Sequence, residues 1–116
     1  MFDSTEIITQ QEEILDAIRN DVFGLIEKTI PSTIGLSEAE IKEIVHSIVN
    51  DVFYDLNSMT TKDPSAKGSI EYVYKSYTSF RAVMYYRVAN HIFYHELLPQ
   101  KLRQEISRDI SEKIWI

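Results

Sequence analysis

The sequence predicts an all-α fold, a compact bundle of about five to six amphipathic helices forming one domain over residues 1–116. Apolar residues recur at steps of three and four along most of the chain, which places them on one face of a helix. The 3 Gly and 3 Pro are interpreted as breaks between these periodic segments. No alternating pattern typical of strands competes with them, and a chain of this length can bury a core.

The first predicted helix carries an apolar stripe and ends near Thr29, because Pro31 disfavours helical geometry in the residue before it. Residues 31–36 are predicted to form a loop. The stripe consists of Ile14, Ile18, Val22, Leu25 and Ile26.

The second predicted helix begins at a capping box, in which Ser37 and Glu40 each satisfy a free amide of the first turn. Residues 57–62 interrupt its pattern, and Asp63-Pro64 then offers a new helix start, with Asp as cap and Pro in the first turn. The apolar stripe contains Ile41, Ile44, Val45, Ile48, Val52, Phe53 and Leu56.

The C-terminal half is predicted to hold three further segments. Gly68-Ser69 precedes a short segment up to Tyr77, and a longer helix starts at Thr78 or Ser79. Pro99 marks the next break. The last helix shows isoleucine or leucine at every fourth position, at Leu102, Ile106, Ile110 and Ile114.

Composition and charge exclude several classes of protein. With 12 Lys+Arg against 18 Asp+Glu the net charge is −6, whereas a nucleic-acid binder needs a basic face. The chain has no cysteine, which excludes disulfides and thiolate catalysis. The acidic segment Met1–Glu6 does not resemble a signal peptide, and no apolar run approaches the ~20 residues that span a bilayer. We therefore expect a soluble cytoplasmic protein with neither nucleic-acid nor membrane partners.

Two groups of residues could carry chemistry or packing. His91 and His95 lie four apart, as a metal pair on a helix would, but no third ligand follows at a recognisable spacing, so packing between helices is the competing interpretation. Arg87 stands in an apolar stretch and needs a carboxylate partner, in this chain or across an interface. Core packing is favoured over a ligand pocket for the aromatic cluster of Tyr72, Tyr74, Tyr77, Phe80, Tyr85, Tyr86, Phe93 and Tyr94.

The residues themselves contain no catalytic set. No serine or threonine lies in a nucleophile elbow or a phosphate-binding loop, and paired carboxylates such as Glu12-Glu13 lie on a polar helix face. We therefore predict no catalytic residue, no metal ligand and no cofactor bound by this chain.

An ordered set of motifs between about Lys62 and Tyr94 resembles the N-terminal helical domain of serine acetyltransferase. The set consists of Asp63-Pro64-Ser65-Ala66-Lys67, then Tyr77-Thr78-Ser79-Phe80-Arg81-Ala82-Val83, and then Tyr86-Arg87-Val88-Ala89-Asn90. That family has Asp-Pro-Ala, Tyr-x-Gly-Phe-x-Ala and Tyr-Arg-Ile-Ala-His in this order. Ser65, Ser79 and Asn90 depart from its Ala, Gly and His.

The resemblance implies a role in transfer of acetyl from acetyl-CoA to L-serine, a step of cysteine biosynthesis. In the family, the Asp of Asp-Pro-Ala reaches toward the amino-acid substrate, which implies that Asp63, Pro64 and Ser65 support a serine site. The catalytic His and the acetyl-CoA site belong to a left-handed β-helix of hexapeptide repeats, which follows a helix like the one ending at Lys113-Ile114-Trp115-Ile116. The isolated chain is therefore expected to be inactive and to form homo-oligomers, with an acetyltransferase β-helix domain as a possible partner.

Two alternatives stay open beside this interpretation. The departures at Ser79 and Asn90 favour a free-standing helical protein-binding module that kept the scaffold without the chemistry. A metal-binding bundle that uses His91 and His95 is the third hypothesis.

Overall fold

The computed structural model describes residues 4–113, which form five α-helices, two short 3₁₀ turns and no strand. This confirms the predicted all-α class. In chain order the elements are α1 (Ser4–Thr29), η1 (Ser32–Ile34), α2 (Glu38–Lys62), η2 (Pro64–Ala66), α3 (Ile70–Ser76), α4 (Thr78–Phe93) and α5 (Gln100–Glu112).

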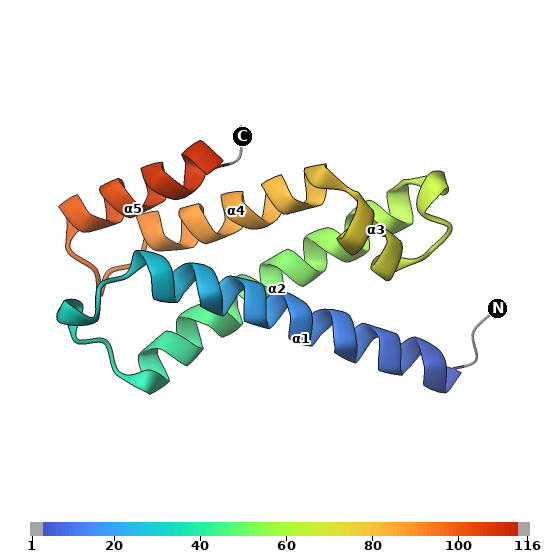
Figure 1. Cartoon of the computed structure of the whole chain (residues 1–116), viewed down its shortest axis with the longest axis horizontal. Coiled ribbons are helices and arrows are strands. Elements are labelled where there is room, and N and C mark those ends of the chain that lie inside the picture. The colour runs from blue at the N-terminus through green and yellow to red at the C-terminus, as the bar shows by residue number, and fades with distance from the viewer. Residues whose placement is uncertain (1–3, 114–116) are drawn as a thin grey trace.

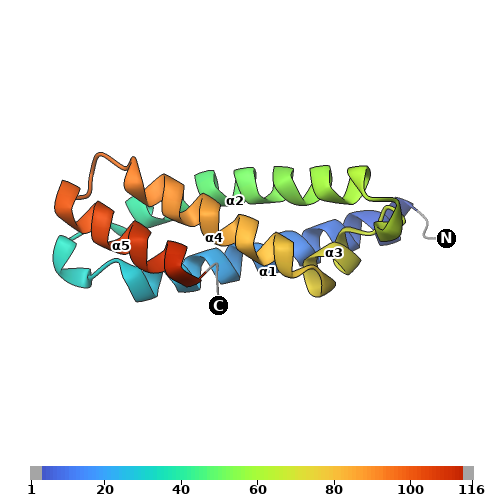
Figure 2. The ribbon, with the colours of Figure 1, turned by 90° about the horizontal axis from the view of Figure 1, so that it is seen from above.

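The helices form an elongated bundle in which α2 is the central element. Helices α1 and α2 pack as an antiparallel pair that cross each other, α4 packs on α2, and α5 folds back along α4 (Figures 1 and 2). The short α3 bridges α1 and α2 at the end of the bundle where α2 terminates. The principal extents are 49 × 30 × 18 Å.

The predicted stripes form the core. Ile14, Ile18, Val22 and Ile26 of α1 are all buried, whereas Leu25 is partly buried beside them. Of the last stripe, Ile106 and Ile110 are buried and Leu102 packs at the edge, while Ile114 lies outside the described residues. The most deeply buried large side chains are Phe80, Ile18, Ile26, Ile48, Leu56, Ile92 and Ile110.

The predicted break at residues 57–62 is wrong, because α2 continues through Lys62. The polar side chains of this stretch bond back to their own helix: Asn57 Nδ2 donates to the Phe53 carbonyl at 3.2 Å, and Thr60 Oγ1 donates to the Leu56 carbonyl at 2.7 Å. Such back-bonding lets polar residues remain helical and even buried, as Thr60 is.

Asp63-Pro64 starts only a 3₁₀ turn and not the predicted helix. Lys67 and Gly68 follow in the left-handed region, with φ of 52° and 74°, which turns the chain away from a helical path. Ser69 then caps α3, its hydroxyl accepting a hydrogen bond from the Tyr72 amide at 3.2 Å. The short segment up to Tyr77 is thus a separate helix.

Other predicted boundaries are confirmed. Ser37 and Glu40 form both bonds of the capping box, at 2.9 and 3.1 Å. Helix α4 begins at Thr78, and Pro99 directly precedes α5. The loop at residues 31–36 contains the η1 turn, and Gly24 lies inside α1 and not at a break.

No helix within residues 4–113 has the length and apolar character needed to cross a membrane. The first three residues of the acidic segment Met1–Glu6, and Ile114-Trp115-Ile116 at the other end, lie outside the described residues.

Candidate functional site

Asp63 lies at the junction between α2 and η2, where its backbone terminates α2 and its side chain caps η2. Its amide donates a last helical hydrogen bond to the Met59 carbonyl at 3.2 Å, and its extended backbone, with φ of −103° and ψ of 111°, ends α2. Its carboxylate Oδ1 accepts from the Ser65 amide at 2.9 Å and so caps η2, in which Pro64 takes the first position. Pro64 and Ser65 are exposed, whereas the Ala66 that follows is buried and anchors the turn.

The second carboxylate oxygen of Asp63 binds a residue 14 positions further along. Tyr77 Oη donates to Asp63 Oδ2 at 2.6 Å. This hydrogen bond, and then that from the Ser65 amide, lowers the pKa of Asp63, because both stabilise the carboxylate. The same bond raises the pKa of Tyr77 to about 12. Asp63 is therefore a charged, half-buried carboxylate with a fixed orientation.

Tyr77 is itself held in place by an aromatic contact. Its ring meets the Tyr72 ring edge-on, with centroids 5.7 Å apart. Since Tyr77 also lies between α3 and α4, the orientation of Asp63 depends on the packing of both helices. Each oxygen of a carboxylate has two lone pairs, so Asp63 keeps acceptor capacity for a further donor such as an ammonium group.

A second polar cluster joins α2 to α4. Arg87 forms a bidentate salt bridge with Asp55: Nε donates to Oδ2 at 2.6 Å, and Nη2 donates to Oδ1 at 2.9 Å. One turn away, His91 Nε2 lies 2.6 Å from Asp51 Oδ2. The bonds to Asp55 raise the pKa of Arg87, which keeps it charged. The prediction that Arg87 needs a carboxylate is confirmed, and the carboxylate belongs to the same chain.

The two histidines of the predicted metal pair have different partners. Helix α4 ends at Phe93, so His95 lies beyond it, where its Nδ1 accepts from the Leu97 amide at 3.3 Å. His91 contacts Asp51 instead. Within residues 4–113, no group of three or more His, Cys, Asp or Glu side chains is arranged to hold a metal ion.

The aromatic cluster is divided between core and surface. Phe80 is buried and Tyr74, Tyr77 and Tyr85 pack partly against the core, as predicted. The prediction is wrong for the other four members, which are exposed by 41–69%: Tyr72, Tyr86, Phe93 and Tyr94.

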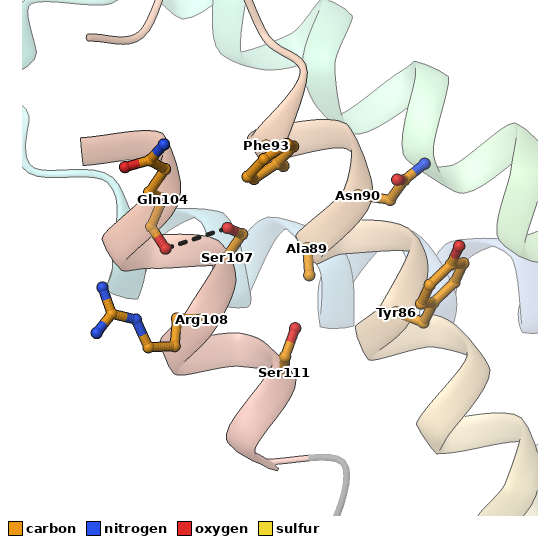
Figure 3. A pocket seen from close by; sticks show the side chains of 8 residues that line it. All are labelled: Tyr86, Ala89, Asn90, Phe93, Gln104, Ser107, Arg108 and Ser111. Carbon is orange, nitrogen blue, oxygen red and sulfur yellow. Dashed lines mark hydrogen bonds between the residues drawn. The ribbon is translucent and has the colours of Figure 1, made fainter. Parts of the chain in front are cut away.

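Two of these exposed rings border an open groove between α4 and α5 (Figure 3). The groove has a volume of about 440 Å³, and Tyr86, Asn90 and Phe93 form its α4 side. The α5 side consists of Gln104, Ser107, Arg108 and Ser111, and Ala89 lies between the two helices. The α5 residues of the groove have no signal in the sequence, because small and polar side chains on an amphipathic helix are typical of its solvent face.

Comparison with family models, with curated proteins and with solved structures finds no match to this chain.

Proposed function

We propose that this chain is a helical assembly domain of a serine acetyltransferase-like protein and that Asp63 supports its serine site. The observation that carries the proposal is the 2.6 Å hydrogen bond from Tyr77 to Asp63. It joins the first two of the three motifs on which the resemblance rests. The third motif contributes Arg87, which ties α4 to α2 through Asp55.

Asp63 has the properties that a substrate-binding carboxylate needs. Its lowered pKa keeps it charged at neutral pH, and Tyr77 and Ser65 fix both of its oxygens. A fixed carboxylate can accept a charge-assisted hydrogen bond from the ammonium group of L-serine. Pro64 and Ser65 shape the exposed turn on which this carboxylate lies.

Under this proposal the chain alone performs no acetyl transfer. Removing the proton from the serine hydroxyl needs a positioned base, and acetyl-CoA needs a binding site of its own. In the proposed protein both belong to the β-helix domain, so acetyl-CoA is a co-substrate of the whole assembly and this chain binds no cofactor. We place the assembly in the cytoplasm as part of the same proposal.

The contribution to assembly is supported by the exposed apolar surface. Tyr86, Phe93, Tyr94 and Leu97 lie in or just after α4 and are 41–69% exposed. Tyrosine and phenylalanine are enriched where subunits meet. We propose homo-oligomers formed through this surface.

The experiment that tests the role of Asp63 is a kinetic comparison of Asp63→Asn with wild type in the native protein. Asparagine keeps an acceptor for the Ser65 amide but removes the charge. We expect KM for L-serine to rise by about tenfold or more, since a hydrogen bond to a charged group contributes about 1.5–3 kcal/mol. The matched control is Asp109→Asn on the exposed side of α5, and an unchanged KM in Asp63→Asn would refute the role.

A free-standing protein-binding module is the second candidate, and one observation favours it. Asn90, which departs from the family pattern, lies in the α4–α5 groove beside Phe93. Under this alternative, Asp63→Asn leaves the affinity for the partner protein unchanged, whereas Asn90→Ala lowers that affinity.

A further inference from the structure

Gly24 lies in the C-terminal third of the 26-residue helix α1, and glycine is the weakest helix-forming residue apart from proline. An isolated glycine inside a helix lowers stability relative to alanine. Crowding does not explain this one, because a methyl group at Gly24 would meet no atom within 4 Å. Its backbone is also not left-handed, unlike that of Gly35 and Gly68. The space beside Gly24 is therefore the feature that needs an explanation.

That space is part of a groove of about 240 Å³ between α1 and α4, where the C-terminal half of α1 runs below α4 in Figure 1. Helix α1 contributes Asn20, Gly24 and Lys28, and helix α4 contributes Arg81. Leu25 and Met84 add apolar surface. The volume corresponds to roughly eight water molecules, which suits a small metabolite.

Two cations of this groove lack partners. Lys28 and Arg81 form no hydrogen bond or ion pair with any residue in 4–113. Both side chains are exposed, so they are accessible to a ligand that enters the groove. Asp21 is the acidic residue that borders the groove, and its Oδ2 already accepts from Tyr74 Oη at 2.6 Å. Two positive charges and one negative charge leave a local charge of +1, which favours a monoanion.

We propose that this groove binds the carboxylate of a small aliphatic acid. Lys28 and Arg81 hold the carboxylate, Arg81 through the fork geometry that matches two oxygens. The missing side chain at Gly24 leaves room for the ligand, and Leu25 and Met84 contact its aliphatic part. This site is independent of the proposed function, since no residue of the three motifs other than Arg81 takes part in it.

The test uses butyrate as the probe and the amide resonance of Gly24 as the readout. The chain has 3 glycines, so Gly35 and Gly68, which do not line the groove, serve as internal controls in a ¹⁵N-glycine-labelled sample. We expect butyrate to shift the Gly24 resonance in a saturable way and to leave the other two unmoved. Neutral 1-butanol should have no effect because it carries no charge, and inorganic phosphate should bind more weakly than butyrate because it has no aliphatic part to contact Leu25 and Met84.

Three variants make the result specific. Arg81→Gln and Lys28→Gln should each weaken butyrate binding at least tenfold, whereas Lys101→Gln, an exposed lysine of α5, should leave it unchanged. Gly24→Ala should melt at the same or a higher temperature than wild type, because alanine favours the helix, and yet lose butyrate. Because Gly24→Ala lacks the glycine probe, its binding is read from the Arg81 side-chain resonance in a separate ¹⁵N-arginine-labelled sample. Equal shifts of all three glycines, an effect of 1-butanol, tighter binding of phosphate, or unaltered affinity in Arg81→Gln would each overturn the proposal.

Discussion

At the scale of single residues, the contact between Asp63 and Tyr77 links local geometry to the proposed site. The two side chains lie 14 residues apart and meet only because η2 and α3 turn the chain back on itself. The sequence identified Asp63 as a cap and, through the resemblance, as a substrate ligand. It did not identify Tyr77 as its partner, since spacing alone does not reveal which side chains a turn brings together.

This contact predicts a pH dependence of stability. Because the pKa of Asp63 is lowered in the folded chain, its stabilisation is present above the unfolded pKa of ~3.9 and is lost as pH falls through the folded value. The Tm difference between wild type and Asp63→Asn should be largest near pH 7 and vanish in strong acid. Thermal melts from pH 7 to pH 2 check this.

Tyr77 predicts the complementary behaviour in alkali. Its pKa is raised to about 12, so its stabilisation is complete below the ordinary value of ~10 and is lost between pH 10 and 12. Tyr77→Phe should remove this loss. If Tyr77→Phe and wild type lose stability in parallel over that range, the hydrogen bond is not present in solution.

For Arg87, the sequence predicts that a carboxylate partner exists but not which carboxylate it is. The need for a carboxylate follows because Arg87 is a charged residue within an otherwise apolar segment, where a charge must be paired. The identity of Asp55 did not follow, because residues one turn apart on α2 offer two carboxylates, Asp51 and Asp55, and only the register of the packed helices assigns them.

At the level of secondary-structure elements, N-cap residues and apolar periodicity predict where most helices begin and which face is buried. Polar residues inside a helix lead to a wrong prediction of a break. Ser37, Thr78 and Pro99 mark helix starts that the structure confirms. The apolar stripe also placed the buried face of α1 correctly. The error at residues 57–62 arose because asparagine and threonine suggest a loop, whereas here they bond back to carbonyls of the same helix.

The capping box gives a prediction for α2. Ser37→Ala removes the acceptor for the Glu40 amide, and the loss of a serine N-cap costs about 1 kcal/mol. Chemical denaturation should show this decrease in the free energy of unfolding with an unchanged m-value. Ser47→Ala, an exposed position within the same helix, is the control and should be neutral or slightly stabilising. Equal effects of the two substitutions would show that the box does not stabilise α2.

For the whole molecule, the sequence predicts the all-α fold class and most of the buried core. It does not predict which apolar side chains lie exposed on the surface. A helical stripe that faces the core and one that faces a neighbour have the same period. For this reason the aromatic cluster was expected inside, and four of its members are exposed instead. The α4–α5 and α1–α4 grooves arise from helix packing and leave no periodic signal in the sequence.

The exposed rings predict an assembly that depends on α4. Phe93→Asp places a charge at the edge of the α4–α5 groove and should reduce the mass measured by light scattering to that of one chain. Tyr54→Asp is the control, because Tyr54 is 71% exposed on a different helix, and it should leave the mass unchanged. A wild-type protein that is already monomeric at high concentration would contradict the assembly role.

We propose above that this helical domain serves a serine acetyltransferase. The most direct measurement is release of CoA from acetyl-CoA, with and without L-serine, by the native protein isolated together with any protein bound to it. We expect release that depends on L-serine and that the 116-residue chain alone does not support. If the native protein and its bound partners show no serine-dependent release, the domain does not serve a serine acetyltransferase.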